Sequence, residues 1–392
     1  MRSDRTQLAT DSLLCAVGDP LDALRGVKPG DADFADAQCV RIGAAVLAKL
    51  PSAMPRVEAA IAELAGQHLS PTELLHRDAG LAWVAGDPLR AIDRYAEIIA
   101  QSPKDLLALR LALSCCFFVG DHRRSCEIAD SALRRYPRHE KGFGVSLALA
   151  SFAHAEIGDA EFAEWLGRAA LELDASCPLG VHAVAHAMVE SGDSIAGADW
   201  MREQRAQWAV NSRMRTHNAW HLAMFDIDNG RHDSAFDILD LSLLPAADRW
   251  PLDACDAVAL LWRLARAGID VGRRWKRLSD AFQGFWEPGF WPYVDLHAAV
   301  AHGEAREQGR LRKLEAGIAV CAAGDDFAAA RARRLTQPAL RALDSWLAGD
   351  LEAAARQIAG VPKLTETGGS RAQIGVFVDS KPTKQNWNGT AA

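Results

Sequence analysis

Apolar helical stretches alternate along the chain with short polar turns that carry a recurring Gly-Asp dipeptide. The dipeptide begins at Gly86, Gly120, Gly158 and Gly192, so successive turns lie 34, 38 and 34 residues apart. Glycine ends one helix in the left-handed conformation, and aspartate caps the next helix by accepting a backbone N–H. The spacing predicts stacked helix–turn–helix units of tetratricopeptide length.

The pattern continues in weaker form, with Asn229-Gly230 at the next turn and Gly324-Asp325 and Gly349-Asp350 later. We therefore expect an all-α solenoid in which each unit buries its apolar face against its neighbours. The expected helical segments cover residues 5–68, 71–101, 105–136, 142–173, 179–208, 215–243, 252–284, 293–322 and 325–358. The expected organisation is an N-terminal helical region (1–70), a repeat array with a histidine-lined concave site (71–360) and a C-terminal tail (361–392).

Two segments of the array each carry two histidines four residues apart, which places both imidazoles on one helix face. The pairs are His182 with His186 and His217 with His221, and equivalent members of the two pairs are 35 residues apart. This register puts the pairs at matching positions on the first helices of adjacent repeats. We expect the four imidazoles to converge on one concave patch.

Neutral imidazoles are good ligands for zinc, iron or copper, so a divalent transition-metal site is predicted there. His297 is a fifth candidate ligand, and the number of candidates allows two ions. Glu190, one turn beyond His186, and Asp295 are the candidate catalytic carboxylates. Asp256 follows His221 by 35 residues and occupies the next equivalent place. Four histidines without this register are expected to be surface or incidental residues: His122, His139, His154 and His232.

Aromatic residues crowd the same region. Trp220 lies inside the second histidine pair, and Trp286 and Trp291 belong to the aromatic loop 285–291. Such residues near convergent polar groups are typical of a small-molecule pocket. The pattern favours a metal-dependent enzyme, hydrolytic or oxidative, that acts on a small molecule. The alternative is a non-catalytic scaffold that binds a peptide or protein partner, with the same histidines as polar contacts.

Charge and composition narrow the choice of partners. The formal net charge is −7 and no Lys/Arg block is present, which argues against nucleic-acid binding. First-helix faces carry His where a groove for an acidic peptide presents Lys and Arg, so a small-molecule substrate is favoured over a peptide. No apolar run is long enough to span a membrane. The eight cysteines form no C-x-x-C pair, which favours a reducing compartment and a cytoplasmic protein. A homodimer is also allowed.

The histidine motifs carry a family resemblance. The segments that carry it are His182-Ala-Val-Ala-His186 with Glu190, Thr216-His-Asn-Ala-Trp-His-Leu-Ala223, Asp295-Leu-His-Ala298, Pro103-Lys-Asp-Leu-Leu-Ala-Leu109, Phe118-Val-Gly-Asp121 and Gly368-Gly-Ser-Arg-Ala-Gln-Ile-Gly-Val-Phe377. Over residues 11–377 the chain resembles the tetratricopeptide repeat protein 38 family, in a bacterial-type form. The resemblance implies a helical-repeat fold and brings no activity with it. The chain departs from the family at Arg371, where the family has His, and at Ile374-Gly375, where it has Arg-Asp.

Overall fold

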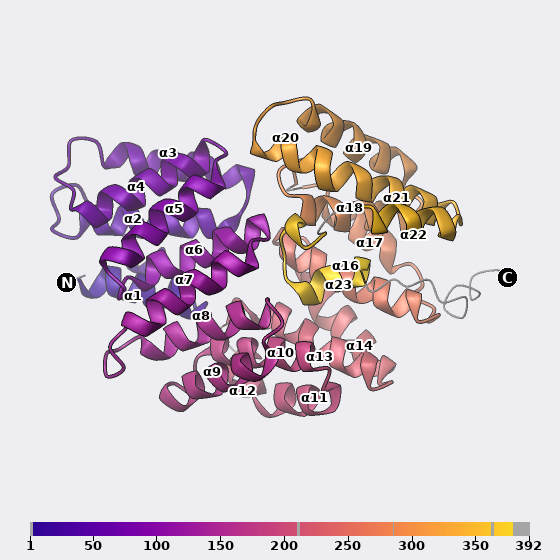
Figure 1. Cartoon of the computed structure of the whole chain (residues 1–392), viewed down its shortest axis with the longest axis horizontal. Helices are drawn as coiled ribbons and strands as arrows, with labels where there is room; N and C mark the ends of the chain where they lie inside the picture. The colour runs from indigo at the N-terminus through magenta and orange to yellow at the C-terminus, as the bar shows by residue number, and fades with distance from the viewer. Residues whose placement is uncertain (1–2, 210–211, 285, 362–363, 379–392) are drawn as a thin grey trace. The chain divides into compact units, whose positions relative to one another are not determined.

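The computed structural model describes residues 3–209, 212–284, 286–361 and 364–378. The chain divides into two compact units, Met1–Arg215 (unit 1) and Thr216–Ala392 (unit 2). Within the described residues every regular element is helical, and the single β pairing is an isolated bridge between Val17 and Ser212. The prediction of an all-α helical-repeat fold is confirmed (Figure 1). No described helix is both long and apolar enough to cross a membrane.

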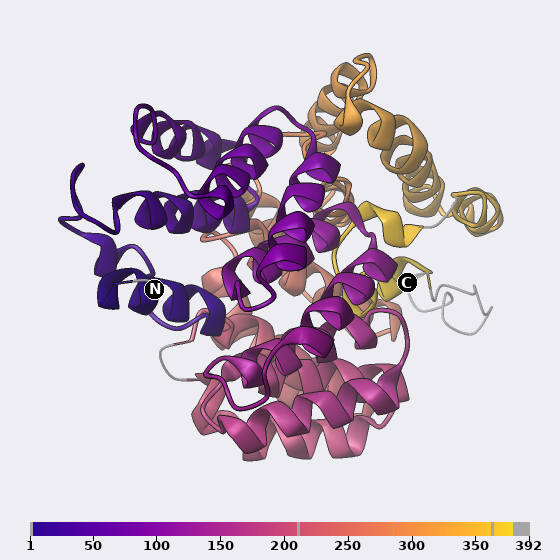
Figure 2. The same cartoon turned by 60° about the vertical axis from the view of Figure 1, so that its left-hand side comes forward.

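Unit 1 consists of helix pairs joined by short turns. Its elements are α1 (Asp4–Cys15), η1 (Asp22–Leu24), α2 (Phe34–Ala48), η2 (Pro51–Ala53), α3 (Met54–Glu63), α4 (Pro71–Val84), α5 (Pro88–Gln101), α6 (Leu106–Val119), α7 (His122–Arg135), α8 (Phe143–Ala155), α9 (Ala160–Leu173), α10 (Pro178–Ser191), α11 (Ser194–Glu203) and α12 (Arg205–Ala209). The first helices α6, α8 and α10 pack side by side, and α5, α7 and α9 each pack on the first helix that follows (Figure 2). This is the stacking that the repeat predicts.

The turns between paired helices use the predicted chemistry. Four of them, Gly86-Asp87, Gly120-Asp121, Gly192-Asp193 and Gly349-Asp350, combine a glycine at positive φ with an aspartate that caps the next helix. In each, the aspartate Oδ1 accepts the backbone N–H three residues on at 3.0 Å. A cap of this kind stabilises a helix by about 1 kcal/mol. The predicted turns therefore set the helix boundaries at these positions.

Two of the predicted turns differ. The Asp159 side chain makes no cap on α9, because its Oδ2 lies 3.2 Å from Nδ1 of His154 instead. At the later Gly324-Asp325 turn, the capping residue of α20 is Asp326, whose Oδ1 accepts from Ala329 N at 2.8 Å. The dipeptide marked the turn correctly there, but the helix begins one residue further on.

First helices are buried on nearly all sides, whereas second helices bury one face. On α10 every residue from Pro178 to Met188 is buried. Glycines let α9 and α10 approach closely, since a Cβ at Gly180 would lie 2.8 Å from Cδ2 of Leu171. Polar side chains on α10 are consequently held in the interior, and a buried polar side chain needs a partner there.

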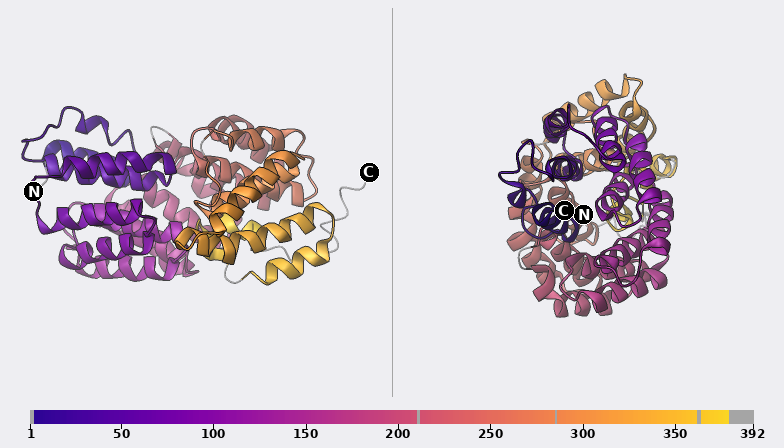
Figure 3. Two further views of the ribbon diagram at one scale, coloured as in Figure 1. Left: turned by 90° about the horizontal axis from the view of Figure 1, so that it is seen from above. Right: turned by 90° about the vertical axis from the view of Figure 1, so that its left-hand side faces the viewer.

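Unit 2 has less regular helix pairs with two π-helical turns, η3 and η4. Its elements are α13 (Arg215–Asp228), α14 (His232–Ile238), η3 (Leu239–Leu243), α15 (Leu244–Ala246), α16 (Pro251–Arg266), α17 (Arg274–Ala281), α18 (Pro292–Glu304), α19 (Gln308–Ala322), α20 (Phe327–Arg331), η4 (Ala332–Thr336), α21 (Gln337–Leu347), α22 (Leu351–Ala359), η5 (Leu364–Thr367) and α23 (Arg371–Val378). Helix α18 packs on α16, α17, α19 and α21, and α21 lies beside α22 (Figure 3). Helix α23 returns to pack on α16.

Candidate functional site

The first histidine pair lies on α10 in unit 1. His182 and His186 are both buried, and their Nε2 atoms are 3.0 Å apart. Phe152 of α8 stacks on the His182 ring and meets the His186 ring with its edge, at centroid distances of 5.5 and 4.8 Å. The prediction that the pair shares one helix face is confirmed, and both Nε2 atoms face a common point.

A carboxylate from the neighbouring helix fixes the orientation of His186. Glu156, at the C-terminal end of α8, is 3% exposed, and its Oε1 lies 3.1 Å from Nδ1 of His186. Its Oε2 lies 3.7 Å from Nδ1 of His122. With Nδ1–H of His186 donating to Glu156, its Nε2 carries a lone pair, which accepts from His182 Nε2–H. A metal ion would replace that proton.

The second pair lies on α13 in unit 2 and repeats this arrangement. The His217 and His221 rings are 4.7 Å apart at 79°, against 4.5 Å and 76° for the first pair. Trp220 takes the place of Phe152: it stacks on His217 at 5.3 Å and meets His221 edge-on at 4.9 Å. The predicted equivalence of the two pairs is thus seen in their local geometry.

The second pair also has a buried carboxylate. Oδ2 of Asp256, on α16, lies 2.7 Å from Nδ1 of His217, and Asp256 is 1% exposed. Gln373 of α23 donates its side-chain N–H to the other carboxylate oxygen, and Ser370 in turn donates to Gln373 Oε1 at 3.0 Å. The C-terminal motif therefore acts as a support that aims Asp256 at the histidine.

The arrangement at each pair is the one that metal-binding histidines use. One ring nitrogen donates to a carboxylate, which fixes the tautomer and orients the other nitrogen toward the metal. Two imidazoles on a tetrahedral zinc ion have nitrogens about 3.3 Å apart, because Zn–N is about 2.0–2.1 Å. The 3.0 Å between the Nε2 atoms of the first pair needs to open only slightly. That the two pairs share one ion stays a prediction.

Asp295 and His297, predicted to complete the site, hold the aromatic loop and the core in place. Asp295 is fully buried and accepts from Trp286 Nε1 at 2.9 Å and from Gly289 N at 3.2 Å. Burial raises the pKa of Asp295 to about 7. Nδ1–H of His297 donates to the Tyr293 carbonyl oxygen at 2.7 Å, and burial lowers the pKa of His297 to about 4. The Asp295 carboxylate is thus engaged by the aromatic loop, whereas Nε2 of His297 has no hydrogen-bond partner among the described residues.

The remaining predicted site residues are dispersed. Trp220 and Trp291 are core residues, with at most 1% exposure, while Trp286 is tied to Asp295. Glu190 is partly exposed, one turn beyond His186 on α10. The catalytic roles of Glu190 and Asp295 stay predictions. Phe285 lies outside the described residues.

Two histidines that lack the 35-residue register of the pairs are nevertheless buried. His122 and His154 are 9% and 7% exposed, so the expectation of surface positions for them was wrong. Glu156, Gln373 and these histidines are the residues that sequence reasoning missed. Glu156 did leave a signal, because an acid at the C-terminal end of a helix opposes the helix dipole and requires compensation.

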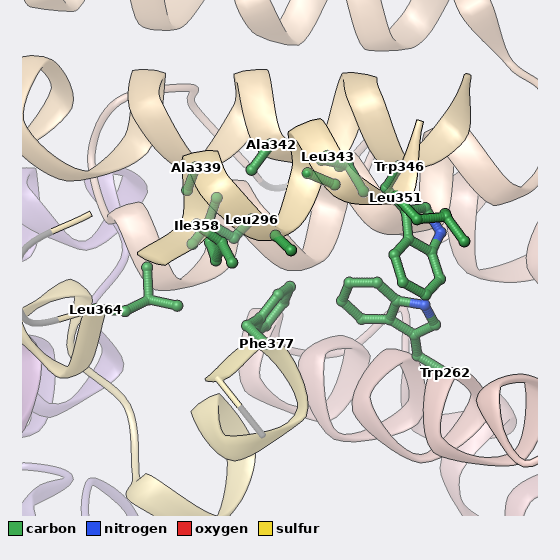
Figure 4. Close-up of a pocket in the computed structure, with 12 residues that line it drawn as sticks. Trp262, Leu296, Ala339, Ala342, Leu343, Trp346, Leu351, Ile358, Leu364 and Phe377 are labelled. Atoms are coloured by element: carbon green, nitrogen blue, oxygen red, sulfur yellow. The ribbon is translucent and has the colours of Figure 1, made fainter. Parts of the chain in front are cut away.

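Unit 2 contains a small apolar groove with a cavity volume of about 60 Å³ (Figure 4). It is lined by Trp262, Leu296, Ala339, Ala342, Leu343, Trp346, Leu351, Ala354, Ala355, Ile358, Leu364 and Phe377. Trp262 meets Trp346 and Phe377 edge-on, at 5.7 and 5.0 Å. The indole N–H of Trp346 donates to Glu304, whereas the buried indole N–H of Trp262 has no acceptor among the described residues. The groove thus offers an apolar surface.

No family model matches the chain. Solved structures of low similarity include a Rap protein complexed with Competence and Sporulation Factor, at 14% identity and a TM-score of 0.49 over 79% of this chain and 92% of that one. Cut9–Hcn1 of the APC/C matches at 10% identity and a TM-score of 0.48, over 94% of this chain and 68% of that one. The human IFIT1 dimer with m7Gppp-AAAA matches at 13% and 0.48, over 97% and 86%. Each likeness concerns the fold alone.

These comparisons correct one expectation. The partners named for the three structures are Competence and Sporulation Factor, Hcn1 and m7Gppp-AAAA, which are macromolecular partners. The sequence-based preference for a small-molecule substrate over a peptide was therefore wrong. It rested on histidines replacing Lys and Arg on first helices, but those histidines face buried carboxylates and aromatic rings within each unit.

Proposed function

We propose that the protein is a helical-repeat scaffold that binds a peptide or protein segment through the groove of unit 2. The observation that carries this proposal is the apolar groove lined by Trp262, Trp346 and Phe377. Trp346 and Phe377 offer apolar surface to a large side chain of the same segment.

The expected ligand is a short amphipathic segment with a Leu, Ile, Met or aromatic anchor. Burial of one such side chain contributes about 1.5–3 kcal/mol. An apolar groove between helices is the usual receptor for the apolar face of a helical peptide. Leu351 and Ile358 lie two turns apart on α22 and are partly exposed, so they can contact a ligand without rearrangement.

A peptide-display library of random 12-residue segments, selected on the full chain, tests this proposal. Selected peptides should share an apolar anchor, and Leu351→Glu should weaken their binding at least about 10-fold by placing a charge in the groove. Leu241→Glu is the matched control, because Leu241 belongs to the same unit and is 78% exposed. Absence of enriched peptides, or equal binding to both variants, would overturn the proposal.

We also propose that the two histidine pairs bind a divalent transition-metal ion: zinc, iron or copper. The support is local and occurs twice, since each pair combines two adjacent imidazoles with a buried carboxylate at 3.1 or 2.7 Å from one Nδ1. The ligands are His182, His186, His217 and His221. In a scaffold a bound ion would rigidify the first helix that carries each pair.

Zinc titration of metal-free protein against a chromophoric chelator tests the metal and its stoichiometry. One ion that is lost both in His182→Ala/His186→Ala and in His217→Ala/His221→Ala supports a shared ion. Two ions, each lost with its own pair, support separate ions and contradict sharing. No binding above that of the quadruple variant would overturn the metal proposal altogether.

The family and location remain part of the proposal. We propose that the chain is a diverged member of the tetratricopeptide repeat protein 38 family, supported by the two histidine motifs and by a C-terminal motif that contacts Asp256 through Gln373. A reducing, cytoplasmic location is supported by eight cysteines that are all free thiols. A suitable reference for family and location is a homologue that has the same two histidine motifs. It should also have the family's His at the position of Arg371 and its Arg-Asp at the positions of Ile374-Gly375.

A further inference from the structure

Cys126, Asp130 and His154 form a cluster of potential ligands in unit 1 that is separate from the histidine pairs. Cys126 and Asp130 lie one turn apart on α7, and His154 lies in the last turn of α8. Nε2 of His154 is 3.5 Å from Sγ of Cys126 and 3.0 Å from Oδ1 of Asp130. One nitrogen, one sulfur and one oxygen therefore lie within 4.8 Å of one another.

A fourth residue orients the histidine. Asp159 occupies the capping position of its turn, yet its Oδ2 lies 3.2 Å from Nδ1 of His154 and caps nothing. The equivalent Asp87, Asp121 and Asp193 all cap their helices. Helix α9 therefore lacks a capping interaction that would stabilise it by about 1 kcal/mol, and the Asp159 carboxylate orients the His154 ring instead. With Nδ1–H donating to Asp159, the lone pair of Nε2 points toward the thiol and the Asp130 carboxylate.

That orientation is unfavourable without a cation. A lone pair and a carboxylate oxygen at 3.0 Å repel each other, so either a proton or a metal ion must lie between them. A bound cation would remove this repulsion, because it attracts the lone pair and the carboxylate alike.

The distances fit a zinc ion. With Zn–N of about 2.05 Å and Zn–S of about 2.3 Å, a tetrahedral ion holds its nitrogen and sulfur ligands about 3.5 Å apart. The measured separation of His154 Nε2 and Cys126 Sγ is 3.5 Å. Asp130 is one-third exposed, which gives an ion a route from solvent, and its other oxygen lies 3.9 Å from the exposed Arg134. The Phe162 ring covers the imidazole from one side, at 4.7 Å.

The geometry points to a second metal site in which Cys126, His154 and Asp130 ligate one zinc-type ion, Asp159 orients His154, and the fourth position is open to water or to a partner's side chain. Three protein ligands and one open position are typical of an exchangeable zinc site. The thiolate gives this site a stronger preference for zinc over magnesium or calcium than the carboxylate alone would give.

Cobalt(II) titration of the full chain tests this site by itself, because the histidine pairs offer no sulfur ligand. The expected result is a near-ultraviolet thiolate-to-cobalt charge-transfer band that saturates at one ion per chain and is absent in Cys126→Ser. Cys321→Ser is the control and should keep the band, since Cys321 belongs to unit 2 and donates to the Gly289 carbonyl oxygen. No band in the wild-type protein, or a band that persists in Cys126→Ser, would overturn the proposal.

Two further variants separate ligation from simple packing. Asp159→Asn should keep the band but weaken cobalt binding about 10- to 100-fold, as loss of a carboxylate behind a ligating histidine does. Should Cys126→Ser fail to fold by circular dichroism, Asp130→Asn decides the matter, because Asp130 is partly exposed and tolerant of change. Its cobalt affinity should fall at least about 10-fold, and an unchanged affinity would overturn the site.

Discussion

Replacement of Glu156 by Gln tests the first histidine pair through a single change of charge. Gln keeps the shape of the side chain and its oxygen can still accept from Nδ1 of His186, so the ring should keep its orientation. The change is the loss of a negative charge 3.1 Å from that nitrogen, on a side chain that is 3% exposed. The imidazole becomes less basic, and Nε2 becomes a weaker ligand.

The magnitude follows from the strength of the hydrogen bond. A bond to a charged acceptor contributes about 1.5–3 kcal/mol and one to a neutral acceptor about 0.5–1.5 kcal/mol, so about 1–1.5 kcal/mol is lost. That loss corresponds to zinc binding weakened about 5- to 10-fold, at the low end of the effect known for such carboxylates. A chelator competition at pH 7.5 measures the dissociation constant directly.

The control is Glu161→Gln on α9, which removes the same charge from an exposed position in the same unit. It should leave the dissociation constant within about 2-fold of the wild-type value, because exposed charges are screened. Equal affinities for wild type, Glu156→Gln and the control would refute the reasoning, since His186 would then not be a ligand that Glu156 tunes.

Three other changes have expected outcomes. Asp256→Asn should weaken zinc binding about 5- to 10-fold through His217, and the same chelator competition should show it, whereas no change would count against the second pair. Gly180→Ala should lower the free energy of unfolding by about 1–3 kcal/mol in urea, because its Cβ would lie 2.8 Å from Leu171, while Gly309→Ala, with open space around it, should not. Burial lowers the pKa of Lys49 from 10.5 to about 7, so its unfavourable burial is fully felt below pH 7 and is relieved as the pH rises to 10.5. The free energy of unfolding of the wild type should therefore gain up to about 5 kcal/mol relative to Lys49→Met over that range, and a difference independent of pH would exclude a neutral Lys49.

The repeat and its turns could be predicted because they depend on local chemistry. A glycine at positive φ followed by a capping aspartate needs no partner from another part of the chain, so Gly120-Asp121 is visible in the sequence alone. The same holds for the spacing within each histidine pair, since residues four apart on a helix are neighbours. The 35-residue register also pointed to Asp256, which follows His221 by one repeat. In the structure, however, Asp256 contacts His217.

The rest depends on contacts between helices. Glu156 reaches His186 from α8, and Gln373 reaches Asp256 from α23, 117 residues away along the chain. No sequence periodicity links these positions, so patterns within single helices cannot predict these contacts. His154 was missed for a similar reason: its partners are Cys126 and Asp130 on the preceding helix and an aspartate diverted from its usual capping role.

The central claim is that the paired imidazoles ligate a metal ion through their Nε2 atoms. X-ray absorption spectroscopy of the Cys126→Ser protein, loaded with one equivalent of zinc and desalted, tests it most directly. The account predicts retained zinc with imidazole nitrogens at about 2.0–2.1 Å as the dominant ligands. Zinc that is washed out, or a coordination shell of oxygen atoms with no imidazole scattering, would contradict it.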